Sequence, residues 1–191
     1  LCTSNTFRNP ALLAKMAATL DVISGGRLFF GIGAGWFEVE HLQYGIPFYT
    51  TGERIRRLDE AVQIIKKIWT EDRATFEGRY YHIKELICSP KPIQKPHPPI
   101  LIGGSGEQLT LKVVAKYANA CNLFGGPEVI KHKLHVLRTH CEMIGRDYGG
   151  ILKTKLGRVV IGRTDEEADL KLQKVKPTHI PLEQYRQENI W

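Results

Sequence analysis

Two glycine-rich segments are the parts of this chain best suited to bind a cofactor. The first, Gly103-Gly104-Ser105-Gly106, follows an apolar run and precedes a predicted helix. Backbone N–H groups and the positive end of a helix dipole would meet there, which suits a phosphate group. Ser105 and Thr110 could add hydroxyl donors. The pattern favours a phosphate site over a flexible turn, although it is not a P-loop, because no Gly-Lys-Ser/Thr sequence follows.

The second segment, Gly31–Trp36, has the sequence Gly-Ile-Gly-Ala-Gly-Trp. It fails as a dinucleotide fingerprint, because Trp36 stands where the third glycine of G-x-G-x-x-G belongs and no suitably spaced acidic residue follows. Two interpretations remain. The glycines could form a tight bend after a strand, or Gly33, Ala34 and Gly35 could expose bare backbone to a flat ring, with Trp36 as an aromatic wall.

Few other polar residues are candidates for chemistry. Thr3, Ser4 and Asn5 follow an apolar start that resembles the tail of a strand, so we expect them at the same mouth as the glycine segments. Glu38 and Glu40 are the only acids close to Gly31–Trp36, and acids in such loops are more typically solvated charges. The histidines are dispersed, and no Ser-His-Asp or Cys-His set can be assembled. The catalytic candidates are therefore limited to Trp36 and Glu38.

Composition narrows the class of protein. The chain has 191 residues, of which 42% are hydrophobic and 25% charged, as in an ordinary globular domain. No apolar run approaches the roughly 20 residues that span a bilayer. The formal net charge is +7, but Lys and Arg are spread over predicted helices, which favours solvated helix faces over nucleic-acid binding. The four cysteines lack C-x-x-C spacing, so we expect free thiols in a cytoplasmic protein and no metal.

Short apolar runs alternate with amphipathic segments, which is typical of βαβ units and a parallel sheet. Helices are expected to begin at the Asn9-Pro10 and Thr50-x-x-Glu53 caps, after Ser105-Gly106-Glu107, at Pro127 and at the Thr164-x-x-Glu167 cap. A hairpin is expected near 76–81, and residues 176–191 show no period. The expected strands are residues 1–4, 28–32, 99–104, 119–124 and 156–161. An open doubly wound sheet and part of a (β/α)8 TIM barrel both fit this order.

The motifs, taken together, resemble one family. The segments that carry the resemblance are Asn5–Lys15, Leu20–Leu28, Gly31–Trp36, Gly52–Leu58 and Pro98–Glu107. In this order they resemble the luciferase-like monooxygenase superfamily, and most of all its deazaflavin branch, which uses coenzyme F-420. The resemblance implies an α/β fold, the (β/α)8 TIM barrel of the bacterial-luciferase-like type. Residues 1–191 would form a single barrel domain truncated at both ends, with strands three to seven present. The absence of an initiator Met supports the same expectation.

The resemblance also implies a function. It implies an oxidoreductase that transfers a hydride between coenzyme F-420 and a small organic substrate, in a protein that forms a homodimer when full length. Thr3–Asn5 and Gly33–Trp36 would flank the ring, while Gly103–Glu107 and Thr110 would hold the phosphate. The alternatives are an FMN-dependent monooxygenase and a non-catalytic flavin-binding relative. The sugar-phosphate dehydrogenases of this branch carry an acidic residue where this chain has Trp36, which argues against glucose 6-phosphate as the substrate.

Overall fold

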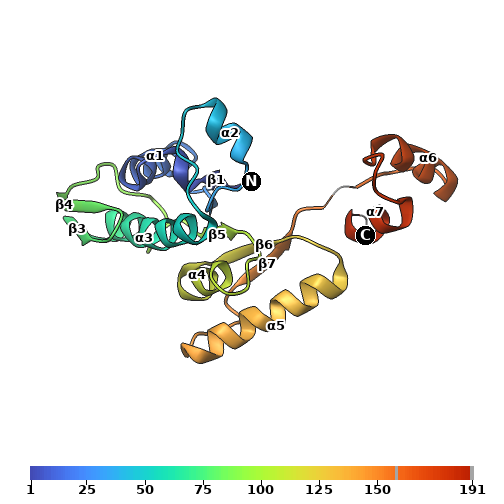
Figure 1. Cartoon of the computed structure of the whole chain (residues 1–191). Helices are drawn as coiled ribbons and strands as arrows, with labels where there is room; N and C mark the ends of the chain where they lie inside the picture. Colours follow the sequence, from blue (N-terminus) through green and yellow to red (C-terminus); the bar gives the residue numbers. More distant parts are fainter. Residues whose placement is uncertain (158, 190–191) are drawn as a thin grey trace.

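The computed structural model describes residues 1–157 and 159–189, and its centre is a parallel β-sheet (Figure 1). Five strands follow the order β1-β2-β5-β6-β7, each parallel to its neighbour. They are β1 (Thr3–Ser4), β2 (Phe30–Gly33), β5 (Ile100–Gly103), β6 (Ala120–Leu123) and β7 (Leu152–Lys155). Every residue of β6 is buried, as expected of a parallel strand with both faces covered.

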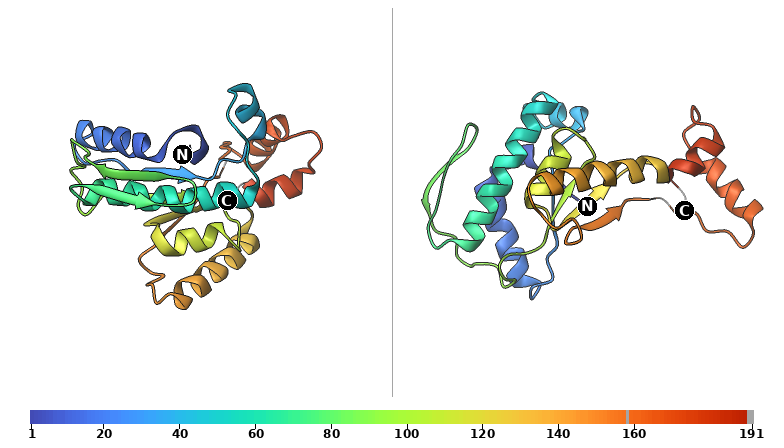
Figure 2. Two further views of the ribbon diagram at one scale, coloured as in Figure 1. Left: turned by 60° about the vertical axis from the view of Figure 1, so that its left-hand side comes forward. Right: turned by 90° about the horizontal axis from the view of Figure 1, so that it is seen from below.

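Helices connect the strands. The connecting helices are α1 (Pro10–Ile23), α2 (Glu38–Gln43), α3 (Thr51–Thr70), α4 (Thr110–Tyr117) and α5 (Pro127–Met143), with a 3-10 turn η1 (Asn5–Phe7) after β1. Asn9 caps α1 through its side chain, and Thr50 caps α3, as the sequence predicts. Helices α6 (Asp165–Val175) and α7 (Leu182–Asn189) lie apart from the sheet in both figures (Figures 1 and 2).

The strand order excludes a doubly wound sheet for the described part of the chain. Parallel strands that follow one another in chain order, joined by right-handed crossovers, place all their helices on one face. Contacts between α1 and α3, α3 and α4, and α4 and α5 show this continuous helical layer. The arrangement is that of part of a TIM barrel, where one layer of helices surrounds the strands.

The core lies between the sheet and this layer. On α3, Leu58, Val62, Ile65 and Trp69 are buried, as the helical spacing predicts. The Trp69 ring packs edge-on against Phe30 of β2, at 5.2 Å between centroids, and its Nε1–H donates to the Ala14 carbonyl of α1 at 2.9 Å. Trp69 therefore fixes α1 and α3 against the start of the second strand.

A hairpin forms an excursion from the barrel outside α3. Strands β3 (Ala74–Glu77) and β4 (His82–Leu86) pair antiparallel, which confirms the hairpin expected near residues 76–81. Glu60 of α3 accepts hydrogen bonds from the backbone N–H groups of Arg79, Tyr80 and Tyr81, at 2.9, 2.9 and 3.1 Å. This carboxylate holds the hairpin turn against the helix.

Several element predictions were wrong. The strand expected at 156–161 is β7 at Leu152–Lys155, and the described residues of 156–161 form no strand; residue 158 lies outside the described residues. Strand β7 is polar, with the sequence Leu-Lys-Thr-Lys. It can still form an edge strand because the Thr154 hydroxyl donates to the Cys121 carbonyl of β6 at 2.9 Å. Strand β2 begins two residues later than expected, and α2 and α7 were not predicted. Among the described residues, no helix is long and apolar enough to cross a membrane.

Candidate functional site

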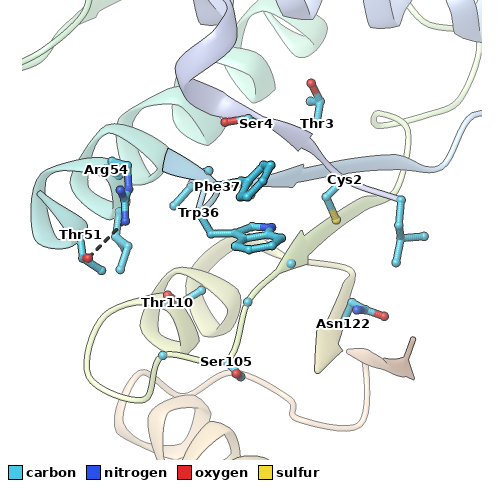
Figure 3. A pocket seen from close by; sticks show the side chains of 18 of the residues that line it. Cys2, Thr3, Ser4, Trp36, Phe37, Thr51, Arg54, Ser105, Thr110 and Asn122 are labelled. Carbon is cyan, nitrogen blue, oxygen red and sulfur yellow. Dashed lines mark hydrogen bonds between the residues drawn. The ribbon is translucent and has the colours of Figure 1, made fainter. Parts of the chain in front are cut away.

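A cavity of about 870 Å³ opens where the carboxyl ends of β1, β2, β5 and β6 meet (Figure 3). Its size is within the range of small-molecule and cofactor sites, and the carboxyl end of the strands is where barrels bind ligands. Its lining residues come from six regions of the chain. They are Leu1–Ser4, Phe7, Gly33–Phe37, Glu40, His41, Thr51, Arg54, Ile55, Gly103–Gly106, Thr110, Asn122, Phe124 and Leu156.

Two glycines at the strand ends leave the floor of the cavity without side chains of β2 and β5, and the Cys2 sulfur lies against one of them. A Cβ on Gly103 would lie 2.8 Å from the Cys2 sulfur, and one on Gly33 would lie 3.4 Å from the Gly103 carbonyl oxygen. Only glycine therefore fits at Gly103 without a shift of Cys2. The two glycines lie side by side as partners in the β2–β5 register, so they form one flat patch. A planar ring can approach such a patch closely.

Aromatic side chains cover this patch. Trp36 and Phe37 extend across the mouth of the cavity in Figure 3, with ring centroids 5.2 Å apart. Trp36 is 82% exposed. A large apolar ring left in solvent loses the benefit of burial, so its exposure at a cavity mouth is typical of a ligand-covering position. Trp36 therefore lies where the sequence places it, while its role as an aromatic wall for a ring stays a prediction.

The glycine-rich loop after β5 offers unused donors to an anion. Among the described residues, the backbone N–H groups of Ser105 and Gly106 and the hydroxyl of Thr110 donate to no protein group. The Gly104 N–H is already taken, since it donates to the Asn122 carbonyl at 3.3 Å. The loop does not run directly into a helix, because a turn at residues 107–109 precedes α4. Thr110, the first residue of α4, lines the cavity, so the helix dipole still favours negative charge there.

Arg54 brings positive charge into the same cavity. Its guanidinium donates to the Tyr49 carbonyl at 3.1 Å and to the Thr51 hydroxyl at 3.2 Å, and its Cζ lies 3.9 Å from the Phe48 ring centroid. The residue is only 6% exposed, its Nε has no hydrogen-bond partner, and no carboxylate of the described residues forms an ion pair with it. A buried guanidinium with a free N–H is costly unless an anion accompanies it.

The cavity unites most of the predicted site residues. Thr3, Ser4, Gly33–Trp36, Gly103–Gly106 and Thr110 all line it. Asn5 does not: it is fully buried beside α3, where its Nδ2 donates to the Tyr81 hydroxyl at 3.4 Å. The exposed side chain of Glu38, at the start of α2, also lies outside the lining, whereas Glu40 is part of it.

Glu107 turns away from the cavity toward α5. Its carboxylate accepts a hydrogen bond from the Lys133 ammonium and lies 3.2 Å from His132 Nε2. The hydrogen bond from Lys133, and to a smaller extent that from His132, lowers the pKa of the Glu107 carboxyl below its usual value. The carboxylate therefore fastens the loop to α5, while the phosphate role of this residue stays a prediction.

Arg54 and His41 were missed in the sequence. One feature of the pattern could have indicated Arg54. It lies in the first turn of α3, where a cation is disfavoured by the helix dipole, so an arginine there needs a further reason. His41 had no such pattern, because the helix that carries it is short and was expected to be a loop.

The site is thus a cavity at the carboxyl ends of the strands of a barrel-type sheet, lined by an exposed tryptophan, by backbone donors without a protein partner and by a buried arginine. Within the described part of the chain, no three His, Cys, Asp or Glu side chains gather as metal ligands would. The fold and the cavity define a barrel-type protein with a ligand-sized cavity at the carboxyl ends of its strands.

Comparison with known proteins identifies the family. The model of the luciferase-like monooxygenase family matches residues 2–189, and the chain belongs to this family. An FMNH2-dependent dimethylsulfone monooxygenase of Pseudomonas putida is 42% identical over 97 residues, which are 51% of this chain and 27% of that protein. An F-420-dependent glucose-6-phosphate dehydrogenase of Kineococcus radiotolerans is 35% identical over 153 residues, which are 76% of this chain and 43% of that protein.

The structural comparison agrees on the fold. An F-420-dependent secondary alcohol dehydrogenase, solved with an F-420–acetone adduct, superposes with a TM-score of 0.82 at 19% sequence identity. The match covers 98% of this chain and 63% of that one. The fold is therefore the α/β fold of luciferase-like TIM barrels, present here as part of a barrel. The chain spans less than half the length of these two curated relatives.

Proposed function

We propose that this chain is the cofactor-binding part of an oxidoreductase that transfers a hydride between coenzyme F-420 and a small organic substrate. The observation that carries the proposal is the pairing of a bare glycine floor with an anion subsite in one cavity. A flat ring bearing a phosphorylated side chain needs both. The F-420-dependent relative, which matches 76% of this chain, supports the same cofactor. We further propose that the five parallel strands are the third to seventh of an eight-stranded barrel.

The residues present fit such a cofactor. The free N–H groups of Ser105 and Gly106, the Thr110 hydroxyl and the buried Arg54 guanidinium would hold the phosphate. Gly33 and Gly103 would support the ring, and Trp36 would cover it. When bound, the coenzyme supplies the hydride chemistry, and the protein supplies binding, orientation and exclusion of water.

The net charge of +7 also favours F-420. This coenzyme has a polyglutamate tail beyond its phosphate, so it brings several more negative charges to the protein surface than FMN does. A basic chain attracts that tail through its mean field, within a Debye length of about 8 Å at physiological salt. Glucose 6-phosphate is not part of this proposal, because the resemblance places Trp36 where the sugar-phosphate dehydrogenases of this branch carry an acidic residue.

A second candidate is an FMN-dependent monooxygenase on the same fold. The specific observation in its favour is the 42% identity to an FMNH2-dependent monooxygenase, although over only 51% of this chain. Its phosphate and ring would use the same residues. The two candidates differ in the tail of the cofactor and in the need for oxygen.

Equilibrium binding of F-420 and FMN to the full-length protein tests the choice. Tighter binding of F-420, and reduction of F-420 by a substrate without consumption of oxygen, are the expected results. Tighter binding of FMN at low and high salt, or oxygen-dependent turnover with reduced FMN, would favour the monooxygenase. Failure of both ligands to bind would reject both candidates.

A further inference from the structure

A chain of hydrogen bonds connects a buried histidine to the cavity. The Ser4 Oγ lies 2.7 Å from the Thr6 Oγ1, which lies 2.6 Å from His41 Nε2. The other ring nitrogen, His41 Nδ1, lies 2.7 Å from the Phe37 carbonyl oxygen. His41 is 1% exposed, whereas Ser4 lines the cavity from the end of β1. We call Ser4, Thr6 and His41 the hydroxyl relay.

The direction of every hydrogen bond in the relay follows from the Phe37 carbonyl, at the end away from the cavity. A carbonyl oxygen can only accept, so His41 Nδ1 must bear the proton that lies between it and Phe37. In the imidazole tautomer that bears its single proton on Nδ1, Nε2 is an acceptor. Thr6 donates its only hydroxyl hydrogen to Nε2, and the short Ser4–Thr6 contact then requires Ser4 as the donor. Ser4 therefore has no hydrogen left for the cavity and presents only lone pairs to it.

We propose that Ser4 recognises the bound ligand as an obligatory hydrogen-bond acceptor, and that His41 is a positioning residue that sets this polarity through Thr6. The group it accepts from is an N–H or O–H of the ligand, and a carbonyl or carboxylate oxygen at that place is rejected. Rejection follows because two facing acceptors leave buried polar groups unpaired. The ligand part of this inference rests on the proposed function, whereas the polarity of the relay does not.

His41 lies in mostly apolar surroundings. Phe7 and Phe48 pack edge-on against it, with centroids 4.9 and 4.8 Å away. Glu38 and Glu40 lie on its own helix, and Arg54 of α3 lies over the same Phe48 ring. No ion pair joins His41 to a carboxylate of the described residues, and both ring nitrogens contact only the Thr6 hydroxyl and the Phe37 carbonyl.

Gly35 leaves room for the relay. A Cβ at this position would lie 2.4 Å from the Ser4 Oγ, 2.9 Å from the Thr6 Oγ1 and 3.3 Å from His41 Cε1. All members of the relay thus pack directly beneath the Gly35 backbone. The need for glycine here goes beyond its φ of +78°, because any side chain would displace the two hydroxyls.

Two substitutions of Thr6 separate the relay from ordinary packing. Thr6→Val keeps the volume and removes the hydroxyl, whereas Thr6→Ser keeps the hydroxyl and removes a methyl. With FMN and F-420 as probes and the full-length protein at pH 7.5, Thr6→Val should weaken binding about three- to tenfold, as expected for one hydrogen bond. Thr6→Ser should stay within about twofold of wild type. The opposite order, or equal effects, would show that Thr6 only packs and would overturn the proposal.

A second measurement decides the relay without any ligand. Long-range proton–nitrogen NMR spectra of the histidine rings, with His41 assigned from the loss of its signal in His41→Gln, show which nitrogen bears the proton. A proton on Nδ1 alone at pH 7.5 supports the relay. A proton on Nε2, or on both nitrogens, overturns it. If neither FMN nor F-420 binds to the wild-type protein, the proposed function fails, and the spectrum still decides the polarity of Ser4.

Discussion

Gly104→Asp is the substitution that tests the phosphate subsite most directly. Gly104 has a φ of +123°, in the region that residues with a side chain rarely adopt, and a Cβ there would lie 3.1 Å from Thr110 Cγ2. Any substitution therefore strains the loop, and strain alone could weaken binding. Gly104→Asn is the matched control, because Asn has the size and shape of Asp without its charge. The difference between the two variants isolates the effect of a negative charge at the subsite.

The size of that difference follows from Coulomb's law. Two unit charges ~6 Å apart in a half-exposed cavity with an effective dielectric constant of ~40 repel by roughly 1.4 kcal/mol. This energy corresponds to about a tenfold loss of affinity. Strain should cost both variants alike, about 1–3 kcal/mol of folding free energy. For a chain of this size, that lowers the melting temperature by several degrees in each variant.

Isothermal titration of FMN and F-420 against wild type, Gly104→Asn and Gly104→Asp gives the required comparison in the full-length protein. The expected result is equal melting temperatures for the two variants and at least about tenfold weaker binding of both cofactors to Gly104→Asp than to wild type. Most of that loss should be absent from Gly104→Asn. Equal affinities of the Asn and Asp variants would refute a phosphate at this loop.

Three further predictions concern other parts of the molecule. Arg54→Met should weaken FMN binding about tenfold but leave riboflavin, which lacks the phosphate, within about twofold, by titration. Burial opposes ionisation of Asp21, but the backbone and side-chain amides of Gln94 outweigh it and lower the pKa of that carboxyl. The resulting stability is complete above about pH 4 and lost below it, so Gln94→Met should cost about 1–3 kcal/mol at pH 7 and less at pH 3 in urea unfolding. The affinity for F-420 should fall more steeply with added salt than that for FMN; parallel slopes would reject the role of the polyglutamate tail.

The sequence predicted the parts of the fold that local chemistry determines. Asn9 and Thr50 begin helices because their side chains cap free N–H groups, and this requires no knowledge of distant residues. The apolar run at Ile100–Gly103 was recognisable as a strand buried on both faces. The order of the strands also followed, since short crossovers place consecutive parallel strands side by side.

The predictions that failed depend on partners far away in the sequence. Strand β7 contains Lys153 and Thr154, whose polar groups are satisfied by Tyr148 and by β6. The strand was expected at 156–161 because Val159 and Ile161 are more apolar, yet these two residues are 78% and 77% exposed. An edge strand needs only one partner, so its composition alone does not reveal it.

The residues of the candidate site also fall into two groups, those recognisable from local sequence and those that depend on distant parts of the chain. Glycine loops at strand ends are recognisable in a sequence because their backbone needs are local, and so Gly33–Trp36 and Gly103–Gly106 were found. Arg54 and His41 belong to the site because α2 and α3 bring them to the mouth, and their burial is a property of the assembled barrel. A residue that gains its role from burial cannot be identified before the elements that bury it are placed.

Gly35 is required both by the local backbone conformation and by side chains from distant parts of the chain. Its positive φ is a local requirement of the bend after β2, and the sequence alone suggests it. Its second requirement is distant, because the space that a Cβ would fill holds the Ser4 and Thr6 hydroxyls from the end of β1 and from η1. The bend thus positions Trp36 over the cavity and at the same time covers the hydroxyl relay beneath it. A side chain at Gly35 would disturb both the aromatic wall and the polarity of Ser4, so one glycine links the shape of this cavity to its hydrogen-bonding character.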